Sequence, residues 1–332
     1  MENILIVVLF IIGLITIIKG GDWFVDAAVW LAKVTGVPNV FIGSTIVSVA
    51  TTLPELFVSS IATYQEHYDV ALGNVVGSIV CNIGLVLGIT ALLAPINLKQ
   101  TTFKTKSLFM LISCLLLLFF VRDTILSSTE GSILIIVFLI YIFISVLEYY
   151  KNEKTQKKSK ETVVSTMVIA KNIGKFCFGA IFITVGAKLL VDNGVALANI
   201  IGVPEQIVSL TLIALGTSLP ELTTAISSII KKEAGISIGN ILGANILNIV
   251  MVLGISSKIS GRGIFISFQN VMIGTEIYAI PQTLYFDIPV ALLLMIILFI
   301  GGLIFKKVNR IMGFLLITTY ILYIGALAKF FL

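Results

Sequence analysis

The stretch Thr51-Thr52-Leu53-Pro54-Glu55-Leu56 returns 166 residues later as Thr217-Ser218-Leu219-Pro220-Glu221-Leu222. The match runs without a gap from residues 36–89 to residues 202–255 and includes two further small-residue and amide motifs. These are Gly73-Asn74, Gly77 and Asn82 in the first copy, and Gly239-Asn240, Gly243 and Asn248 in the second. A constant offset over such a length indicates a duplicated unit. Each copy places one glutamate inside an otherwise apolar, helix-length segment.

The composition predicts an integral membrane protein. Of the 332 residues, 58% are hydrophobic and 12% are charged, so the chain cannot cover itself with a water-facing surface. A span needs about 20 mostly apolar residues, and the continuous apolar runs favour helices over a barrel. We predict ten spans, at residues 3–32, 40–64, 70–93, 104–121, 131–150, 165–197, 206–230, 236–257, 287–305 and 309–331.

Basic residues cluster in alternate connections, which predicts the orientation in the cell membrane. The richest cluster is residues 151–161, with five lysines and two glutamates. The positive-inside rule places this loop in the cytoplasm and both termini outside. A nucleic-acid or anionic-lipid role for the loop is the competing interpretation, and a solvated linker is favoured. The first three residues lack a basic n-region, and no small-residue cleavage site follows, so we expect no removable signal peptide.

Five spans on each side of this linker force the two copies into opposite orientations. The predicted fold is therefore an all-α polytopic membrane protein, with ten transmembrane helices arranged as two inverted five-helix repeats. Residues 1–150 form the first repeat, 151–164 the basic cytoplasmic linker and 165–332 the second repeat.

Glu55 and Glu221 are unusual because each places a carboxylate inside an apolar span. A carboxylate near the bilayer centre costs about 2.5 to 3.5 kcal/mol even on the lenient insertion scale. No buried Lys or Arg stands at a matching place in the two copies. The natural partner of both carboxylates is a cation that binds and leaves.

Pro54 and Pro220 predict a break in the helix beside each glutamate. Proline lacks an N–H and clashes with the carbonyl four residues earlier, so carbonyl oxygens are freed around residues 49–51 and 215–217. Such carbonyls are tolerated at membrane depth only when buried in protein or used on a ligand. Hydroxyls stand beside them, on Thr51, Thr52, Thr217 and Ser218.

The glycine-rich second motif of each copy lets backbones approach closely, which is commonly just helix packing. Here it would bring polar side chains against the broken helix, namely Ser78, Asn82, Asn245 and Asn248. An interhelical hydrogen bond is the simpler interpretation of each asparagine. Cys81, Cys114 and Cys177 fall in apolar spans and are interpreted as packing residues rather than a disulfide or metal framework.

Carboxylates, amides, hydroxyls and carbonyls are hard ligands, and the constellation holds no histidine or thiolate. Calcium, which takes 6 to 8 oxygens in irregular geometry, fits better than zinc or copper. Sodium could use the same oxygens, whereas magnesium holds its water and demands an octahedron. No organic cofactor is expected.

These motifs resemble the alpha repeats of the cation/calcium exchanger superfamily, whose hallmark is Gly-(Ser/Thr)-Ser-x-Pro-Glu followed by Gly-Asn-x-x-Gly-Ser-Asn. The second copy matches the first motif fully over residues 216–221, whereas the first copy has Ala50 and Thr52 in place of Gly and Ser. The resemblance covers the whole chain, which is similar in particular to prokaryotic sodium/calcium exchangers.

The resemblance implies sodium-coupled calcium antiport by alternating access, with calcium and sodium as transported ions and four sites between the second, third, seventh and eighth helices. Glu55 and Glu221 would be the shared carboxylates. The other ligands implied are the carbonyls of Thr51, Thr217, Ser48 and Ala214, the hydroxyls of Ser78, Thr52 and Ser218 at outlying sodium sites, and the flanking amides Asn82 and Asn248. A single copy of the chain would be sufficient.

Three residues depart from the family pattern. Ile79 replaces an Asn and costs a packing bond, while Ala244 replaces the serine that corresponds to Ser78 and removes one oxygen from a sodium site. Asn248 stands where several members, including potassium-dependent ones, carry Asp. The site then carries a charge of −2, which one calcium ion balances.

Three other functions compete with this one. A proton-coupled calcium antiporter needs the same two glutamates and is the nearest alternative. An intramembrane enzyme would need a nucleophile with a base or a His-rich metal site, neither of which the motifs contain. A channel would more often show symmetry about a pore axis formed by several chains.

Overall fold

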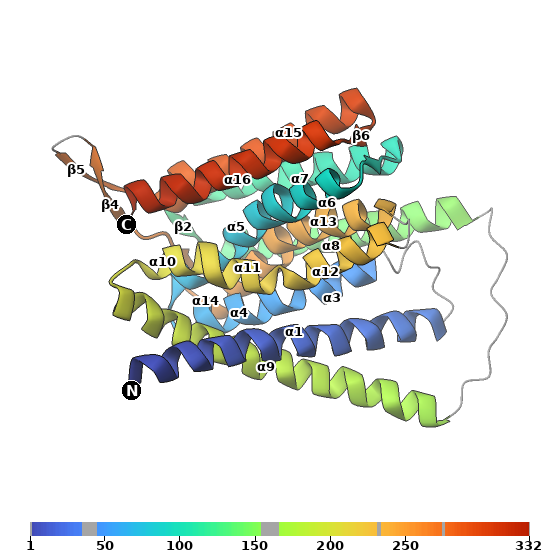
Figure 1. The fold of residues 1–332 in the computed structure, drawn as a ribbon, viewed down its shortest axis with the longest axis horizontal. Helices are drawn as coiled ribbons and strands as arrows, with labels where there is room; N and C mark the ends of the chain where they lie inside the picture. Colours follow the sequence, from blue (N-terminus) through green and yellow to red (C-terminus); the bar gives the residue numbers. More distant parts are fainter. Residues whose placement is uncertain (1, 35–44, 154–165, 231–233, 274–275, 332) are drawn as a thin grey trace.

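The computed structural model describes residues 2–34, 45–153, 166–230, 234–273 and 276–331, which form a bundle of long helices (Figure 1). The elements of the first half are α1 (Glu2–Val34), α3 (Val47–Thr51), α4 (Leu53–Tyr64), α5 (Tyr68–Val80), η2 (Cys81–Leu87), α6 (Gly88–Leu93), β1 (Ile96–Asn97), α7 (Gln100–Phe120), η3 (Val121–Asp123), β2 (Ile125–Leu126) and α8 (Ser128–Glu153). Those of the second half are α9 (Thr166–Ile201), α10 (Glu205–Val208), η4 (Ser209–Ile213), α11 (Ala214–Thr217), α12 (Leu219–Ile230), α13 (Ala234–Leu247), η5 (Asn248–Leu253), α14 (Gly254–Ser260), β3 (Ile264–Phe265), β4 (Gln269–Ile273), β5 (Glu276–Ile280), η6 (Thr283–Asp287), α15 (Ile288–Phe305), β6 (Lys307–Val308) and α16 (Arg310–Phe330).

Nine helical segments within the described ranges are long and apolar enough to cross a membrane, and they correspond to nine of the ten predicted spans. The remaining predicted span is 40–64. Its residues 40–44 lie outside the described part of the chain, and α3 and α4 form most of the remainder. Most of the predicted linker, residues 154–164, also lies outside it.

Two segments form the centre of the bundle. In Tyr68–Leu93, 83% of the most apolar window is buried inside the protein, and in Ser237–Ser260 the buried share is 94%. In Ser128–Leu147, by contrast, it is 22%. These central segments are α5–η2–α6 and α13–η5–α14, the glycine-rich parts of the two copies. Small residues let the neighbouring helices approach their backbones, so protein rather than lipid surrounds them.

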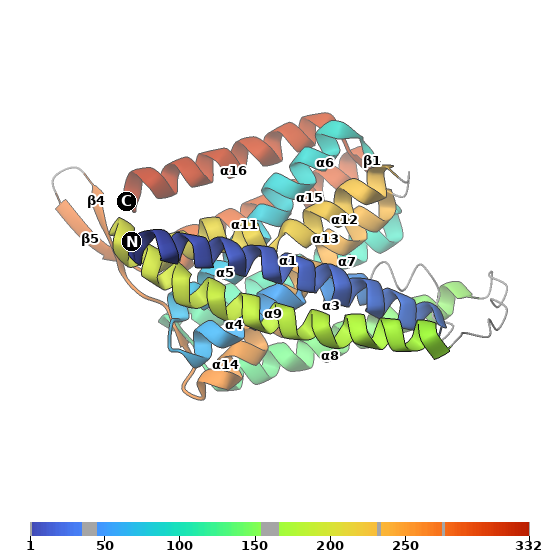
Figure 2. The ribbon, with the colours of Figure 1, turned by 60° about the horizontal axis from the view of Figure 1, so that its bottom comes forward.

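Helices α1 and α9 lie side by side along the bundle and in opposite directions (Figures 1 and 2). A Cβ atom added to Gly13 would lie 3.2 Å from the carbonyl oxygen of Gly186, and one added to Gly20 would lie 2.9 Å from that of Gly179. Gly179 and Gly186 are the repeat mates of Gly13 and Gly20. The two contacts are therefore images of each other under the 166-residue offset.

The ends of the bundle differ in what they carry. The start of α1, the end of α16 and the β4–β5 hairpin lie at one end, whereas the end of α8 and the start of α9 lie at the other (Figure 1). Three short antiparallel strand pairs, β1–β6, β2–β3 and β4–β5, join connections between helices. The all-α prediction did not include these strands, because β1–β6 and β2–β3 pair over only two residues each and β4–β5 is a short hairpin, with five residues in each strand, outside the apolar spans.

Candidate functional site

The predicted helix breaks are confirmed at Thr52 and Ser218. Helix α3 ends at Thr51 and α4 begins at Leu53, with Thr52 at φ −84° and ψ −3°. Ser218 has nearly the same conformation, φ −83° and ψ 1°, between α11 and α12. The proline two residues after each break supplies no N–H to the preceding turn. Each break lies three residues before a glutamate.

Glu55 and Glu221 are both completely buried. Their four carboxylate oxygens have no hydrogen-bond partner among the described residues. Leaving an ionised carboxylate buried and unpaired is among the most costly arrangements in a protein interior. A cation bound between the two glutamates would remove that cost.

Asn74 and Asn240 connect the broken helix of one half to the central helix of the other. The Thr217 hydroxyl donates to Asn74 Oδ1 at 3.1 Å, and the Thr51 hydroxyl lies 3.4 Å from Asn240 Oδ1. These contacts are images of each other under the 166-residue offset. Asn74 and Asn240 were recognised as repeated positions but were not among the predicted site residues.

The surroundings of these two asparagines differ. Asn74 Nδ2 donates to the carbonyl oxygen of Glu55 at 3.2 Å and to the Ser59 hydroxyl at 2.9 Å. The repeat mate of Ser59 is Ala225, which has no hydroxyl, and Asn240 Nδ2 has no partner among the described residues. The Asn74 side-chain amide therefore uses both its nitrogen and its oxygen in hydrogen bonds, whereas the nitrogen of the Asn240 amide has no partner among the described residues.

Two of the four predicted backbone ligands, the carbonyls of Ser48 and Ala214, already accept hydrogen bonds. The Ser48 carbonyl accepts from Thr52 N at 3.1 Å and from the Thr52 hydroxyl at 2.7 Å. The Ala214 carbonyl accepts from Ser218 N at 3.0 Å, and the Thr217 hydroxyl lies 3.3 Å from it. A hydroxyl that donates its proton in this way keeps oxygen lone pairs for a cation.

Asn82 and Asn248 lie where the two central helices widen into π-helical turns. Asn82 is the second residue of η2 and Asn248 the first of η5. Asn82 Nδ2 donates to Asn245 Oδ1 at 3.3 Å, whereas Asn82 Oδ1 and both polar atoms of the Asn248 amide have no partner in the described part of the chain. π-Helical turns often mark functional positions because they turn side chains and backbone groups out of the regular ladder.

The remaining predicted hydroxyls are completely or almost completely buried. Ser78 Oγ lies 3.2 Å from Thr217 Oγ1, so it contacts the broken helix of the other half. Ser218 Oγ has no partner among the described residues. Within the described ranges no three His, Cys, Asp or Glu side chains are grouped closely enough to hold a metal ion, so neutral oxygens must complete any cation site here.

A further buried carboxylate, that of Asp287, lies outside the repeated motifs of the sequence. Asp287 is completely buried and accepts hydrogen bonds from Gln206 Nε2 at 2.9 Å, Tyr323 Oη at 2.9 Å and Gln282 Nε2 at 3.3 Å. These donors satisfy the carboxylate and join α10, η6 and α16. The duplication does not mark this position, because the repeat mate of Asp287 is Val121.

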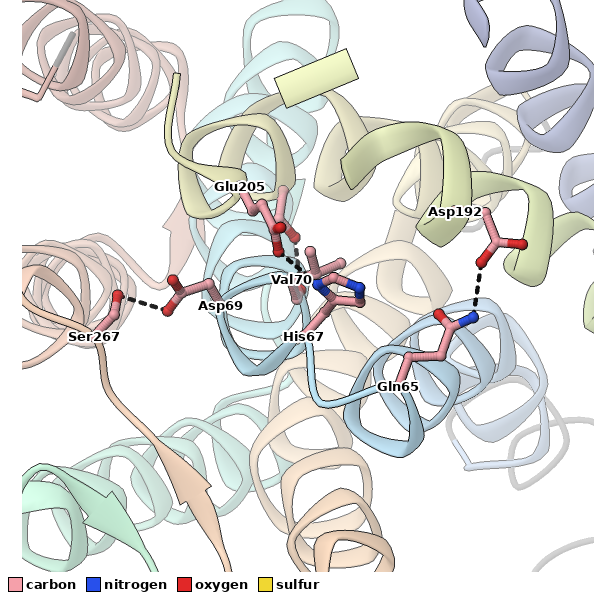
Figure 3. Close-up of polar contacts among 8 residues, drawn as sticks. Gln65, His67, Asp69, Val70, Asp192, Glu205 and Ser267 are labelled. Carbon is pink, nitrogen blue, oxygen red and sulfur yellow. Dashed lines mark hydrogen bonds and ion pairs between the residues drawn. The ribbon is translucent and has the colours of Figure 1, made fainter. Parts of the chain in front are cut away.

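Polar contacts also join the halves at the turn between α4 and α5 (Figure 3). Gln65 donates to Asp192 at 2.7 Å, and His67 Nδ1 lies 2.9 Å from Glu205 Oε2. Asp69 accepts from the Ser267 hydroxyl at 2.7 Å. This turn is therefore held against α9, α10 and the connection after β3.

Comparison with known proteins gives one consistent relationship over nearly the whole chain. The sequence model of the family described as sodium/calcium exchanger protein matches residues 5–147 and 171–329. The sodium/calcium exchanger MaX1 of Methanosarcina acetivorans is 28% identical over 358 residues, covering 96% of this chain and 97% of that protein. The putative antiporter CaxA of Alkalimonas amylolytica is 31% identical over 325 residues, covering 94% and 95%. A solved structure of the sodium-calcium exchanger NCX_Mj, soaked with 2.5 mM Na+ and 1 mM Sr2+, has a TM-score of 0.68 at 28% identity and covers 97% of this chain and 98% of its own.

Proposed function

Because this chain belongs to the sodium/calcium exchanger family, we propose that it exchanges calcium for sodium across the cell membrane by alternating access, with the ions bound between Glu55 and Glu221. One observation carries the proposal. Two completely buried carboxylates, one from each half, have no hydrogen-bond partner among the described residues. A transported cation supplies that partner, and its release leaves the carboxylates ready for the next ion. The chemistry is transport, with no bond made or broken.

The charge of the site suits this exchange. Glu55 and Glu221 together carry −2, and neutral amides stand at Asn82 and Asn248. One calcium ion balances that charge, and hard oxygen ligands are those it prefers. The ligands that we propose, beside the two glutamates, are the carbonyls of Thr51, Thr217, Ser48 and Ala214, the amides of Asn82 and Asn248, and the hydroxyls of Thr52, Ser218 and Ser78.

Alternating access follows from two units of similar structure and opposite orientation, which we place at residues 1–150 and 165–332 with a linker at 151–164. The reciprocal contacts of Gly13 with Gly186 and of Gly20 with Gly179 support this arrangement. A two-fold axis between antiparallel helices is perpendicular to both, so it lies in the membrane plane. One chain contains both glutamates, and a single copy is sufficient for transport.

The orientation that we propose has the 151–164 linker in the cytoplasm and both termini outside. Its support is the lysine bias of the sequence together with the placement of the chain ends at the end of the bundle opposite the last turn of α8.

Calcium uptake into sodium-loaded liposomes containing the purified protein tests the function. Uptake should require the outward sodium gradient and should stop when that gradient is collapsed. Uptake that ignores sodium but follows an imposed pH gradient would replace sodium by protons as the coupling ion. Calcium flux that does not saturate and needs no counter-ion would instead indicate a channel.

A further inference from the structure

The two halves place one glycine each against the broken helix of the other half. A Cβ atom added to Gly77 on α5 would lie 2.7 Å from the Cβ atom of Ala214 on α11. At the image position, a Cβ atom added to Gly243 on α13 would lie 2.4 Å from the Ser48 hydroxyl oxygen and 2.8 Å from the Ser48 Cβ atom on α3. Ser48 and Ala214 are repeat mates, so the two interfaces differ by one hydroxyl on the broken helix.

The residues that follow these two glycines on the central helices also differ by one hydroxyl, but here the interface that lacks the hydroxyl on its broken helix has it. Ser78 follows Gly77, whereas Ala244 follows Gly243. The α5–α11 interface therefore has its hydroxyl on the central helix, at Ser78, and a methyl at Ala214. The α3–α13 interface has its hydroxyl on the broken helix, at Ser48, and a methyl at Ala244. Beside the threonine of each broken helix, Thr217 or Thr51, each interface therefore has one serine hydroxyl, and the two serines stand on opposite helices.

The Ser48 hydroxyl lies among the groups that correspond to the neighbours of Ser78. Ser78 contacts Thr217, which in turn reaches Asn74. Ser48 lies one helical turn before Thr51 and so shares a face with it, and the two hydroxyls approach the same residue. Ser48 Oγ lies 3.4 Å from the Asn240 carbonyl oxygen and Thr51 Oγ1 lies 3.4 Å from Asn240 Oδ1. Both distances are at the long limit of a hydrogen bond, and a hydroxyl that donates its proton to a neighbour keeps oxygen lone pairs for a cation.

We propose that the Ser48 hydroxyl is a sodium ligand on the Thr51 side of the site, in place of the hydroxyl that Ala244 lacks. This inference rests on the proposed function and revises the expectation that Ala244 costs the site one oxygen. A sodium ion is held by neutral oxygens whichever helix supplies them, so moving a hydroxyl across a tight interface conserves the ligand count. Gly243 is what permits the exchange, because a side chain there would occupy the position of the Ser48 hydroxyl.

The decisive variants exchange hydroxyls at this one interface. Ser48→Ala removes the hydroxyl, and Ser48→Ala combined with Ala244→Ser recreates the alanine and serine arrangement of the other interface. Ser113→Ala is the matched control, because Ser113 is a buried serine on α7 whose hydroxyl donates to the Phe109 carbonyl at 2.9 Å. Each protein is reconstituted in liposomes, and the sodium concentration for half-maximal calcium exchange and the calcium affinity are measured separately.

Ser48→Ala should raise the half-maximal sodium concentration about fivefold, the effect of losing one polar contact of ordinary strength, with little change in calcium affinity. The double variant should return sodium dependence close to that of the parent, and Ser113→Ala should leave it unchanged. Unaltered sodium dependence in Ser48→Ala would overturn the role of Ser48 while leaving the proposed function intact. If Ser48→Ala weakened the binding of sodium and calcium equally, and adding Ala244→Ser did not restore it, Ser48 would be assigned to helix packing. A parental protein that exchanges calcium without sodium would overturn both proposals.

Discussion

The hydroxyl of Ser78 lies 3.2 Å from the hydroxyl of Thr217, which joins the central helix of the first half to the broken helix of the second. Thr217 donates to Asn74, and Asn74 donates to the carbonyl oxygen of Glu55. Asn74, which bonds the turn that presents Glu55, is therefore itself bonded by a residue of the opposite half. Any rearrangement that separates α5 from α11 must break this series of hydrogen bonds or carry it along intact.

Glu55→Gln and Glu221→Gln should each abolish calcium exchange and leave a folded protein. Each substitution removes one of two buried charges that have no hydrogen-bond partner among the described residues, so the midpoint of thermal unfolding should stay level or rise. The measurements are calcium uptake in liposomes and thermal unfolding in detergent. Glu276→Gln, on an exposed hairpin strand, is the charge-loss control and should behave like the parent. Parental uptake in either buried variant would rule out a two-carboxylate site.

Asn74→Ala should destabilise the protein more than Asn240→Ala. The Asn74 amide donates to two acceptors and accepts from Thr217, whereas Asn240 Nδ2 has no partner among the described residues. Breaking such buried bonds costs about 1 to 3 kcal/mol for each group left unsatisfied. The two substitutions are chemically identical and occupy repeat-mate positions, so each is the control of the other in a thermal unfolding assay. Equal shifts of the unfolding midpoint would show that the different hydrogen bonding of Asn74 and Asn240 does not affect the stability of the protein.

Gly20→Val should disturb the pairing of α1 with α9 and reduce both the yield of folded protein and the rate of exchange. A Cβ atom at Gly20 would lie 2.7 Å from the backbone nitrogen of Ile183, and backbone cannot move aside as a flexible side chain can. Gly174→Val on α9 is the control, because an added Cβ atom there meets nothing within 4 Å. Size-exclusion profiles and exchange rates report the outcome. Indistinguishable behaviour of the two variants would contradict a close α1–α9 interface.

A cysteine introduced at Ser159, on a background without Cys81, Cys114 and Cys177, should resist impermeant thiol reagents in intact cells. Residue 159 lies in the basic linker that we assign to the cytoplasm. Glu276→Cys on the same background is the opposite marker, because the β4–β5 hairpin lies at the end of the bundle that carries the chain termini. It should be labelled readily. Reversed labelling would invert the orientation.

Exchange should move net charge if three sodium ions, the number that the family resemblance implies, replace one calcium ion. The site carries −2, so calcium leaves it neutral and three sodium ions leave it at +1. Calcium uptake into sodium-loaded liposomes should then respond to an imposed membrane potential, and potassium should not be required. Uptake that is insensitive to voltage would indicate two sodium ions for each calcium.

The parts of this structure that could be predicted from the sequence are those caused by a single residue type acting locally. Pro54 and Pro220 remove a particular backbone hydrogen bond, so the breaks at Thr52 and Ser218 follow from covalent structure. The burial of Glu55 follows in the same way from its place inside an apolar segment. Because the duplication repeats these residues, the sequence marks the site twice.

Contacts between segments that the repeat does not relate to each other could not be predicted from the sequence. Nothing in the sequence pairs His67 with Glu205 or directs Gln206 toward Asp287, because the register between α10 and its neighbours is decided by packing over many residues. The relationship of Ser48 to Ala244 was missed for a related reason. In the alignment of the copies each residue is compared with its own mate, whereas in space each lies against a residue of the other half.

The unequal hydrogen bonding of Asn74 and Asn240 has a consequence for the resting protein. In a transporter whose halves exchange roles, two chemically identical halves would make the inward-open and outward-open forms equal in free energy. Here the Asn74 amide is fully hydrogen-bonded, whereas Asn240 Nδ2 has no partner among the described residues, so exchanging the roles of the two halves would change the free energy of the empty molecule. If the two halves exchange roles as we propose, the unloaded protein should accordingly favour one side of the membrane before any ion or voltage acts on it.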